Sequence, residues 1–202
     1  MNKPLRRAMQ YLAMRTRDQA KYDSIVDASI KLTNELGFDG ISISKIAKKA
    51  KVSPATIYIY FENKEDLLSK LYIDIKRKMS QGALEGFKEE MTTEETFKSI
   101  WHHAFSFNLR HPEYLAYREQ FERTTMMKKI RAEEFELFQT IDNLLKRGIK
   151  EKTIKDIPLS ILTAFSYAPI ITLLNYHHAG IVKMDEDHIT QACEIAWNAI
   201  LS

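Results

Sequence analysis

The most constraining feature of this chain is the stretch 42–66, which has the pattern of two short helices joined by a tight turn. Ser42 stands at an N-cap position, and Ile46 lies on the apolar face of the helix that follows. After the turn, Ser53 provides a second N-cap, and Pro54 occupies the first helical position, where its missing N–H costs nothing. The pattern predicts a second helix of roughly seven to nine residues.

This second helix carries its large apolar residues on one side only. A rotation of about 100 degrees per residue places Ile57 and Phe61 together, so we expect both to pack on the preceding helices. Ala55, Thr56 and Ile59 then point away from that packed side and present a slim, uncharged surface. A surface of this shape suits a groove of double-stranded DNA.

Two tyrosines, Tyr58 and Tyr60, flank the buried side of the same helix. They are either ordinary half-buried aromatic residues or hydroxyl donors that reach DNA, and the surrounding pattern favours the second interpretation. The helix has no Arg, Asn or Gln that could read guanine or adenine with two hydrogen bonds. We therefore expect specificity to depend on apolar contacts, backbone amides, water and DNA shape.

Over roughly residues 20–68, the chain resembles the N-terminal DNA-binding domain of the TetR family of bacterial transcriptional repressors. The motifs that carry the resemblance lie in order along the chain: Ile25-Val26-Asp27-Ala28, Gly37-Phe38, Ile46-Ala47, Ile57-Tyr58-Ile59-Tyr60-Phe61 and Lys64-Glu65-Asp66-Leu67-Leu68. The resemblance implies an all-α fold of about nine helices, with an N-terminal three-helix helix-turn-helix domain. A C-terminal helical domain would bind an effector and dimerise.

One residue departs from the family pattern, because Lys51 stands where the family usually has glycine in the turn. A lysine there either adopts a left-handed conformation at some cost, distorts the turn, or reaches a phosphate. Lys64, at the start of the fourth helix, is expected to meet a phosphate together with free backbone N–H groups. The residues predicted to bind DNA are Ser42, Ser44, Lys45, Ser53, Pro54, Ala55, Thr56, Tyr58, Tyr60 and Lys64.

Charge is unevenly distributed along the chain. The overall formal charge is +3, but residues 1–64 hold twelve Lys and Arg against six Asp and Glu. We predict a basic arm over 1–17, a helix-turn-helix domain over 18–66, and an effector-binding and dimerisation domain over 67–202. The arm either follows phosphates or an adjacent minor groove, or is a tail that only adds solubility.

Helix starts and ends can be predicted along the whole chain from capping residues, glycines and prolines. Capping boxes at Thr16/Gln19 and Thr92/Glu95, a cap at Asn63, and prolines 112 and 158 mark starts, whereas glycines 37 and 148 mark ends. The pattern predicts further helices over about 130–147 and 185–201. Pro169 is expected to kink the helix that starts at Pro158 and to free the carbonyl of Phe165.

The stretch Ile157–Val182 contains no Lys, Arg, Asp or Glu and is long enough to span a bilayer. Its many Ser, Thr, Asn, His and Pro residues favour a helix buried by neighbouring helices or by another subunit. A small DNA-binding module needs two copies for useful affinity, so we expect a homodimer through the last two helices, with Trp197 as a candidate anchor. The family resemblance implies the same interface.

Aromatic residues crowd the region between residues 97 and 176. Most are expected to be core, but a TetR-like regulator would hold an apolar effector pocket there. The residues predicted to line it are Trp101, Phe105, Tyr117, Phe121, Phe165 and Tyr167. An aromatic pocket accepts apolar or cationic molecules, so the sequence does not identify the effector.

Other classes of function have little support in the sequence. Cys193 is the only cysteine, which excludes an intrachain disulfide and fits a reducing cytoplasm. The adjacent histidine pairs 102/103 and 177/178 are poorly spaced for one metal ion, and the patterns of a catalytic triad or a phosphate loop are missing. We predict a cytoplasmic repressor without cofactor or enzymatic activity that an effector releases from its operator. The alternative is a DNA-binding protein regulated by a protein partner or with an architectural role.

Overall fold

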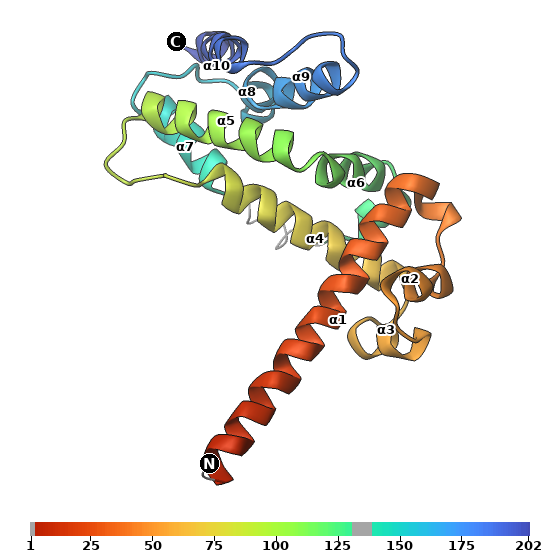
Figure 1. The fold of residues 1–202 in the computed structure, drawn as a ribbon. Helices are drawn as coiled ribbons and strands as arrows, with labels where there is room; N and C mark the ends of the chain where they lie inside the picture. The colour runs from red at the N-terminus through yellow and green to blue at the C-terminus, as the bar shows by residue number, and fades with distance from the viewer. Residues whose placement is uncertain (1–2, 131–138) are drawn as a thin grey trace. The chain divides into compact units, whose positions relative to one another are not determined.

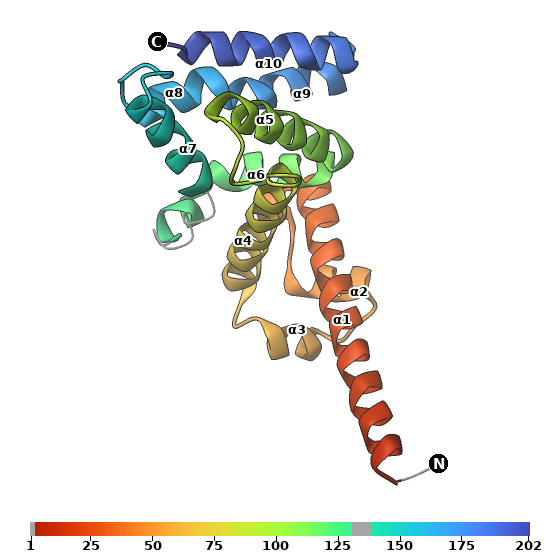
Figure 2. The same cartoon turned by 90° about the vertical axis from the view of Figure 1, so that its left-hand side faces the viewer.

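The computed structural model describes the backbone of residues 3–130 and 139–202, and side chains in this range from Asp18 onward. These residues form α-helices and one short 3-10 helix (Figures 1 and 2). The pairing of Ile154 with Leu201 is an isolated bridge outside any strand. The elements are α1 (Lys3–Gly40), α2 (Ile43–Ala50), α3 (Pro54–Tyr60), α4 (Lys64–Ala83), α5 (Thr93–Arg110), α6 (Pro112–Glu122), η1 (Thr125–Lys129), α7 (Gln139–Lys150), α8 (Leu159–Ser166), α9 (Ala168–His178) and α10 (Glu186–Ile200). The all-α prediction is confirmed.

The chain divides into two compact units. The first comprises Met1–Tyr72 and Ala116–Lys129, and the second comprises Ile73–Leu115 and Ile130–Ser202. Helices α4 and α6 each contribute residues to both units. Residues 116–129 thus belong with the N-terminal helices, although the sequence pattern placed them in the C-terminal domain.

The first unit is built on α1, which packs against α2, which in turn packs against α3. Its core contains Ile25, Ile46, Ile57 and Leu68, each almost inaccessible to solvent. The predicted start of the first helix at a Thr16 capping box is wrong, because α1 already begins at Lys3. The predicted helix end at Gly37 corresponds to a kink, where φ is +70° and α1 changes direction before Gly40.

The second unit has α5 at its centre. Helices α7, α9 and α10 pack on α5, and α10 also packs on α8. Phe97, Trp101, Phe105 and Trp197 lie in its core, where the ring of Phe97 lies 5.0 Å from that of Trp197. Trp197 is therefore buried within its own subunit and is not available as the predicted anchor of a dimer interface.

The uncharged segment forms two helices, α8 and α9, which are separated at Tyr167. Pro169 lies in the first turn of α9. The chain therefore starts a new helix here, where the sequence predicted a kink within one helix. The carbonyl of Ser166, at the end of α8, accepts a hydrogen bond from the indole of Trp101. Within the described residues, Leu159–His178 has the length and hydropathy of a membrane span, and 22% of that window is buried. The predicted burial by helices of the same subunit is therefore wrong, and burial by another subunit stays a prediction.

The end of helix α7 differs from the end that the sequence predicted. Gly148 was expected to end this helix, but α7 continues to Lys150, and Gly148 is buried within it. A Cβ at Gly148 would collide with the side chain of Ile154, so the glycine permits close packing of the following segment. The predicted start of this helix near residue 130 adjoins residues 131–138, which lie outside the described residues.

Candidate nucleic-acid interface

The turn between α2 and α3 is held by hydrogen bonds within a few residues. The Ser42 Oγ accepts from the backbone N–H of Lys45 at 3.3 Å, as its N-cap position predicts. At the other end of α2, Lys51 adopts the left-handed conformation, with φ of 56° and ψ of 40°. Its backbone N–H donates to the carbonyls of Ala47 and Lys48. The turn is therefore regular, and its lysine bears the conformational cost that a glycine avoids.

Helix α3 begins as the sequence predicts. Pro54 is in the first turn, and the Ser53 Oγ accepts from the backbone N–H of Thr56 at 3.2 Å. The hydroxyls of Ser53 and Thr56 also lie 2.9 Å apart and share a hydrogen bond. The hydroxyl of Thr56, one of the residues predicted to bind DNA, is therefore already oriented by the helix cap.

The two faces of α3 differ in the predicted way. Ile57 and Phe61 are buried in the core of the first unit. Ile59 is 76% exposed and Tyr58 is 56% exposed, so both side chains stand free of the protein surface. An exposed isoleucine beside an exposed tyrosine makes an outward face that combines apolar area with one hydroxyl.

Tyr60 has a different environment from Tyr58. Its hydroxyl donates to the carbonyl of Asp18 on α1 at 3.3 Å, and its ring meets the ring of Tyr22 edge-on at 5.7 Å. The side chain is half-buried between α3 and α1. Tyr60 therefore helps to fix α3 on α1 and has the half-buried environment that the sequence offered as one of two alternatives.

Two lysines at the helix-turn-helix hold the end of α1. The Lys64 ammonium donates to the carbonyls of Phe38 and Ile41 at 2.8 and 2.9 Å, and the Lys45 ammonium donates to the carbonyl of Gly40 at 2.6 Å. An ammonium group has three donors, so Lys64 keeps one for a further acceptor. The positive charges of α2 and α4 are thereby fixed beside the α1–α2 connection.

The fourth helix also begins as predicted. The Asn63 Oδ1 accepts from the backbone N–H of Asp66 at 2.9 Å, which confirms the expected cap. Burial of the Asp66 carboxyl opposes ionisation, but its hydrogen bonds from Lys70 and from the Glu62 amide outweigh burial and lower its pKa. Asp66 thus remains an anion at neutral pH and joins the turn before α4 to the helix itself.

The ten predicted DNA-binding residues all lie on α2, α3, their caps and the first turn of α4, within the first unit. Thr56, Tyr60 and Lys64 are half-buried and make the intramolecular hydrogen bonds described above. The others are exposed, namely Ser42, Ser44, Lys45, Ser53, Pro54, Ala55 and Tyr58. The fold therefore brings the set together on neighbouring elements.

The six aromatic residues predicted to line an effector pocket are divided between different environments. Trp101 and Phe105 stack within the core of the second unit, with ring centroids 5.5 Å apart. Tyr117 and Phe121 belong to the first unit, where the Tyr117 hydroxyl donates to the carbonyl of Leu68 at 2.9 Å. All four are completely buried, so the structure does not gather the six residues around one cavity.

The remaining two aromatic residues lie at the break between α8 and α9. Phe165 is 63% exposed and lines an open hollow with residues of α9 and α10, apart from the buried Trp101, Phe105, Tyr117 and Phe121; its role in effector binding stays a prediction. Tyr167 is half-buried, and its hydroxyl has no hydrogen-bond partner among the described residues. Burial raises the pKa of Tyr167, so its hydroxyl stays protonated.

Titratable residues in the described part of the chain are candidates for metal ligands and, for Cys193, for a reactive thiol. No cluster of three His, Cys, Asp or Glu residues with the spacing of a metal site occurs there. Burial, with a smaller effect of the Glu194 charge, raises the pKa of the Cys193 thiol to about 12. The thiol is therefore protonated at neutral pH and behaves as a small apolar side chain.

Comparison with known families agrees with this geometry. Residues 25–71 match the model of bacterial regulatory proteins of the tetR family, and residues 93–201 match the tetracyclin repressor-like C-terminal domain. The chain belongs to the TetR family. The first match contains the helix-turn-helix, and the second extends from the start of α5 to the end of α10.

Relatives of this TetR-family chain are transcriptional regulators. The fatty acid metabolism regulator protein of Bacillus subtilis is 32% identical over 140 residues, which cover 67% of this chain and 72% of that protein. A TetR family transcription regulator from Marinobacter aquaeolei has a TM-score of 0.87 at 31% identity, covering 93% of this chain and 99% of that one. The regulator FadR from Bacillus subtilis, solved in complex with stearoyl-CoA, shares the fold with a TM-score of 0.72 at 24% identity, covering 89% and 97%.

Proposed function

We propose that this TetR-family regulator is a sequence-specific repressor that binds its operator as a homodimer and is released by a small effector. The observation that carries the DNA-binding part is the outward face of α3, where Tyr58 and Ile59 are exposed on a helix whose start is capped by Ser53. Contact with a DNA groove would bury Ile59, which is 76% exposed in the free protein.

In this proposal, phosphates are bound by the N-terminal parts of α2 and α4, and bases are read by α3. Ser42, Ser44 and Lys45 lie at the start of α2 and are exposed, as backbone contacts require. Lys64 uses its remaining donor on a phosphate, while its other two hold α1 in position. The basic residues 1–17 follow the neighbouring phosphates, and the protein works in the cytoplasm with its DNA.

The dimer in this proposal forms through α8, α9 and α10. Exposed apolar side chains gather on these helices and their connection, namely Ile161, Phe165, Tyr176, Ile181 and Ile195. A hollow of about 390 Å³ between α8, α9 and α10 is lined by Ala164, Phe165, Pro169, Leu173, Ala192 and Ile195. A self-complementary contact across a twofold axis buries this surface and places two recognition helices on successive groove faces.

The effector in this proposal has an apolar chain. This inference is supported by the name of the Bacillus subtilis relative, a fatty acid metabolism regulator, and by the stearoyl-CoA complex of the FadR neighbour. Occupancy would shift α4, which is anchored in the DNA-binding unit at Leu67 and Leu68. A coupling of about 1 to 3 kcal/mol suffices for roughly 5- to 150-fold weaker operator binding.

A footprinting experiment tests the proposed function. The purified protein is titrated onto the DNA upstream of its own gene, with and without stearoyl-CoA, and compared with a Tyr58→Ala/Ile59→Ala variant. We expect one protected site with approximate twofold symmetry, which the variant and the acyl-CoA both weaken. Uniform retention of all sequences, or protection that the double variant leaves unchanged, would refute specific repression through α3.

The complete burial of Trp101, Phe105, Tyr117 and Phe121 favours a second candidate, a DNA-binding protein whose core is filled and whose activity a protein partner controls. The same titration discriminates the two candidates. A specific footprint that persists at saturating acyl-CoA, combined with the absence of any bound small molecule in native mass spectrometry, would support the second. Neither candidate involves turnover of a substrate.

A further inference from the structure

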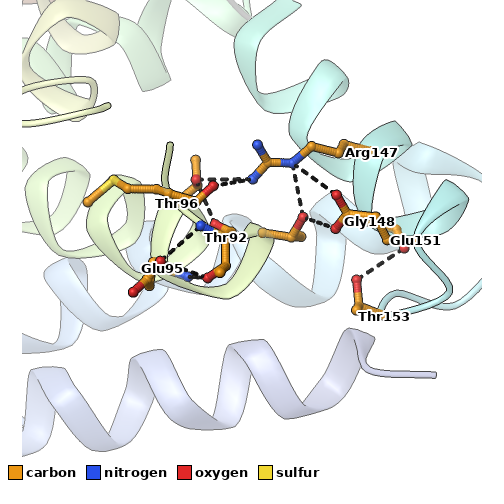
Figure 3. Close-up of polar contacts among 9 residues, drawn as sticks. Thr92, Glu95, Thr96, Arg147, Gly148, Glu151 and Thr153 are labelled. Carbon is orange, nitrogen blue, oxygen red and sulfur yellow. Dashed lines mark hydrogen bonds and ion pairs between the residues drawn. The ribbon is translucent and has the colours of Figure 1, made fainter. Parts of the chain in front are cut away.

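A polar network fixes Arg147 against the beginning of α5 in the second unit (Figure 3). The Arg147 Nε donates to the hydroxyl of Thr93 at 3.0 Å, and its Nη2 donates to the carbonyl of Met91 and to the hydroxyl of Thr96, both at 3.2 Å. Three neutral acceptors thus hold the planar guanidinium in one orientation. A guanidinium held in this way loses little further freedom when it binds a ligand.

The charge of Arg147 is only partly compensated inside this network. The nearest carboxylate, that of Glu151, lies 3.8 Å from Nε, and it accepts its short hydrogen bond from the Thr93 hydroxyl at 2.5 Å instead. The Nη1 group of Arg147 has no partner among the described residues, and Figure 3 draws this terminal nitrogen without a contact. The positive end of the α5 dipole adds to the local positive potential.

Arg147 also forms part of the wall of a cavity of about 210 Å³. The lining residues come from α7, the first turn of α5 and the loop before it, namely Phe87, Thr96, Thr140, Asn143, Leu144 and Arg147. The side chains of Thr140 and Asn143 have no hydrogen-bond partner among the described residues, so they add donors to Arg147 Nη1. Phe87 and Leu144 contribute apolar side chains to the same lining.

We propose that this cavity binds the oxyanion head group of a small amphiphilic ligand, with Arg147 as the principal anion-binding residue. A guanidinium edge with neighbouring hydroxyl and amide donors suits a carboxylate or a phosphate, and the apolar wall suits the first methylene groups attached to it. The cavity has the volume of about seven water molecules, which fits a head group and a short chain. This inference adds to the proposed function the chemical nature of the effector's charged end. Its role in regulation rests on the proposed function.

Calorimetric titration of the full-length protein without DNA tests the site. The probes are hexanoate, hexyl phosphate and the uncharged hexan-1-ol, and the first two distinguish a carboxylate from a phosphate source. We expect one of the two anions to bind, hexan-1-ol to bind at least about 10-fold more weakly, and Arg147→Gln to weaken the anion by about 10-fold or more. Absence of binding by both anions, or equal binding of hexan-1-ol, would overturn the inference.

A second variant avoids the structural network around Arg147. Asn143→Asp places a negative charge on the exposed cavity wall and is expected to weaken anion binding about as strongly as Arg147→Gln. Lys146→Gln changes the net charge of the same helix by the same amount outside the cavity and should have little effect. If Asn143→Asp and Lys146→Gln bind the anion equally, the site is elsewhere. Anion binding at this site without release from the operator would contradict the proposed function alone.

Discussion

The indole Nε1 of Trp101 donates a hydrogen bond of 3.0 Å to the carbonyl oxygen of Ser166, the last residue of α8. Both residues are completely buried, and the bond joins α5 to the break between α8 and α9. The carbonyl at this break would otherwise be a buried acceptor without a partner.

Replacement of Trp101 by phenylalanine removes this donor. We expect Trp101→Phe to lower the free energy of unfolding by about 1 to 3 kcal/mol more than the loss of apolar area alone explains. Urea unfolding monitored by circular dichroism measures the change. Trp197→Phe is the matched control, because Trp197 is similarly buried in the same unit. Equal destabilisation by the two variants would show that the hydrogen bond contributes nothing specific.

Lys51 holds a left-handed conformation that glycine adopts without a steric cost. Lys51→Gly is therefore expected to stabilise the first unit by about 1 kcal/mol, as measured by thermal and urea unfolding. Lys51→Gln removes the charge but keeps a Cβ atom, and with it the steric cost of the left-handed conformation. It should therefore leave stability almost unchanged. A stabilisation by Lys51→Gln as large as that by glycine would assign the effect to charge.

Ile59 is the most exposed large apolar residue on α3, and a thymine methyl group is the apolar contact that a major groove offers. We expect Ile59→Ala to weaken operator binding about four-fold for each thymine methyl group that the shorter side chain no longer reaches. Operators in which uracil replaces thymine, measured by fluorescence anisotropy, identify the base that Ile59 touches. At that base, uracil should weaken the wild-type protein and leave the variant unaffected; parallel losses in both would place the isoleucine away from thymine.

The Glu95 carboxylate accepts from the backbone N–H and the hydroxyl of Thr92, and these bonds lower its pKa. Because the folded state binds its proton less readily, this stabilisation is present above the ordinary pKa of glutamate and is lost as the pH falls through the folded-state value. Glutamine also serves in a capping box. Glu95→Gln should therefore lose less thermal stability between pH 7 and pH 3 than the wild-type protein does. Glu90→Gln, a control at an exposed position, should lose as much as the wild-type protein.

Ile195 is 70% exposed on α10 and lines the hollow proposed as part of the dimer interface. Ile195→Asp should leave the subunit fold intact and weaken dimerisation by roughly 100-fold, because each subunit would bury an unpaired carboxylate. Sedimentation velocity across a concentration series measures the dissociation constant. Asn198→Asp adds the same charge to an exposed position on the same helix, outside the lining of the hollow. An unchanged dimer in Ile195→Asp would exclude this face.

Local capping patterns were sufficient to predict where α2, α3, α4 and α5 begin. Ser42, Ser53, Asn63 and Thr92 each cap the helix that the sequence assigned to them, since a cap joins residues only three positions apart. The helical rotation likewise predicted that Ile57 would be buried and Ile59 exposed. Hydrogen bonds between residues this close in the sequence depend only on the local order of residue types, so they can be predicted without knowledge of the fold.

The sequence by itself thus determined the caps of α2, α3, α4 and α5 and the outward face of α3. Only the tertiary structure decided that Lys64 binds the carbonyl of Phe38, 26 residues away, and that Trp101 binds that of Ser166, 65 residues away. It also placed Gly148 inside α7, where a side chain would collide with Ile154. Such partners depend on how distant helices pack, and many packings are compatible with the same pattern of apolar residues.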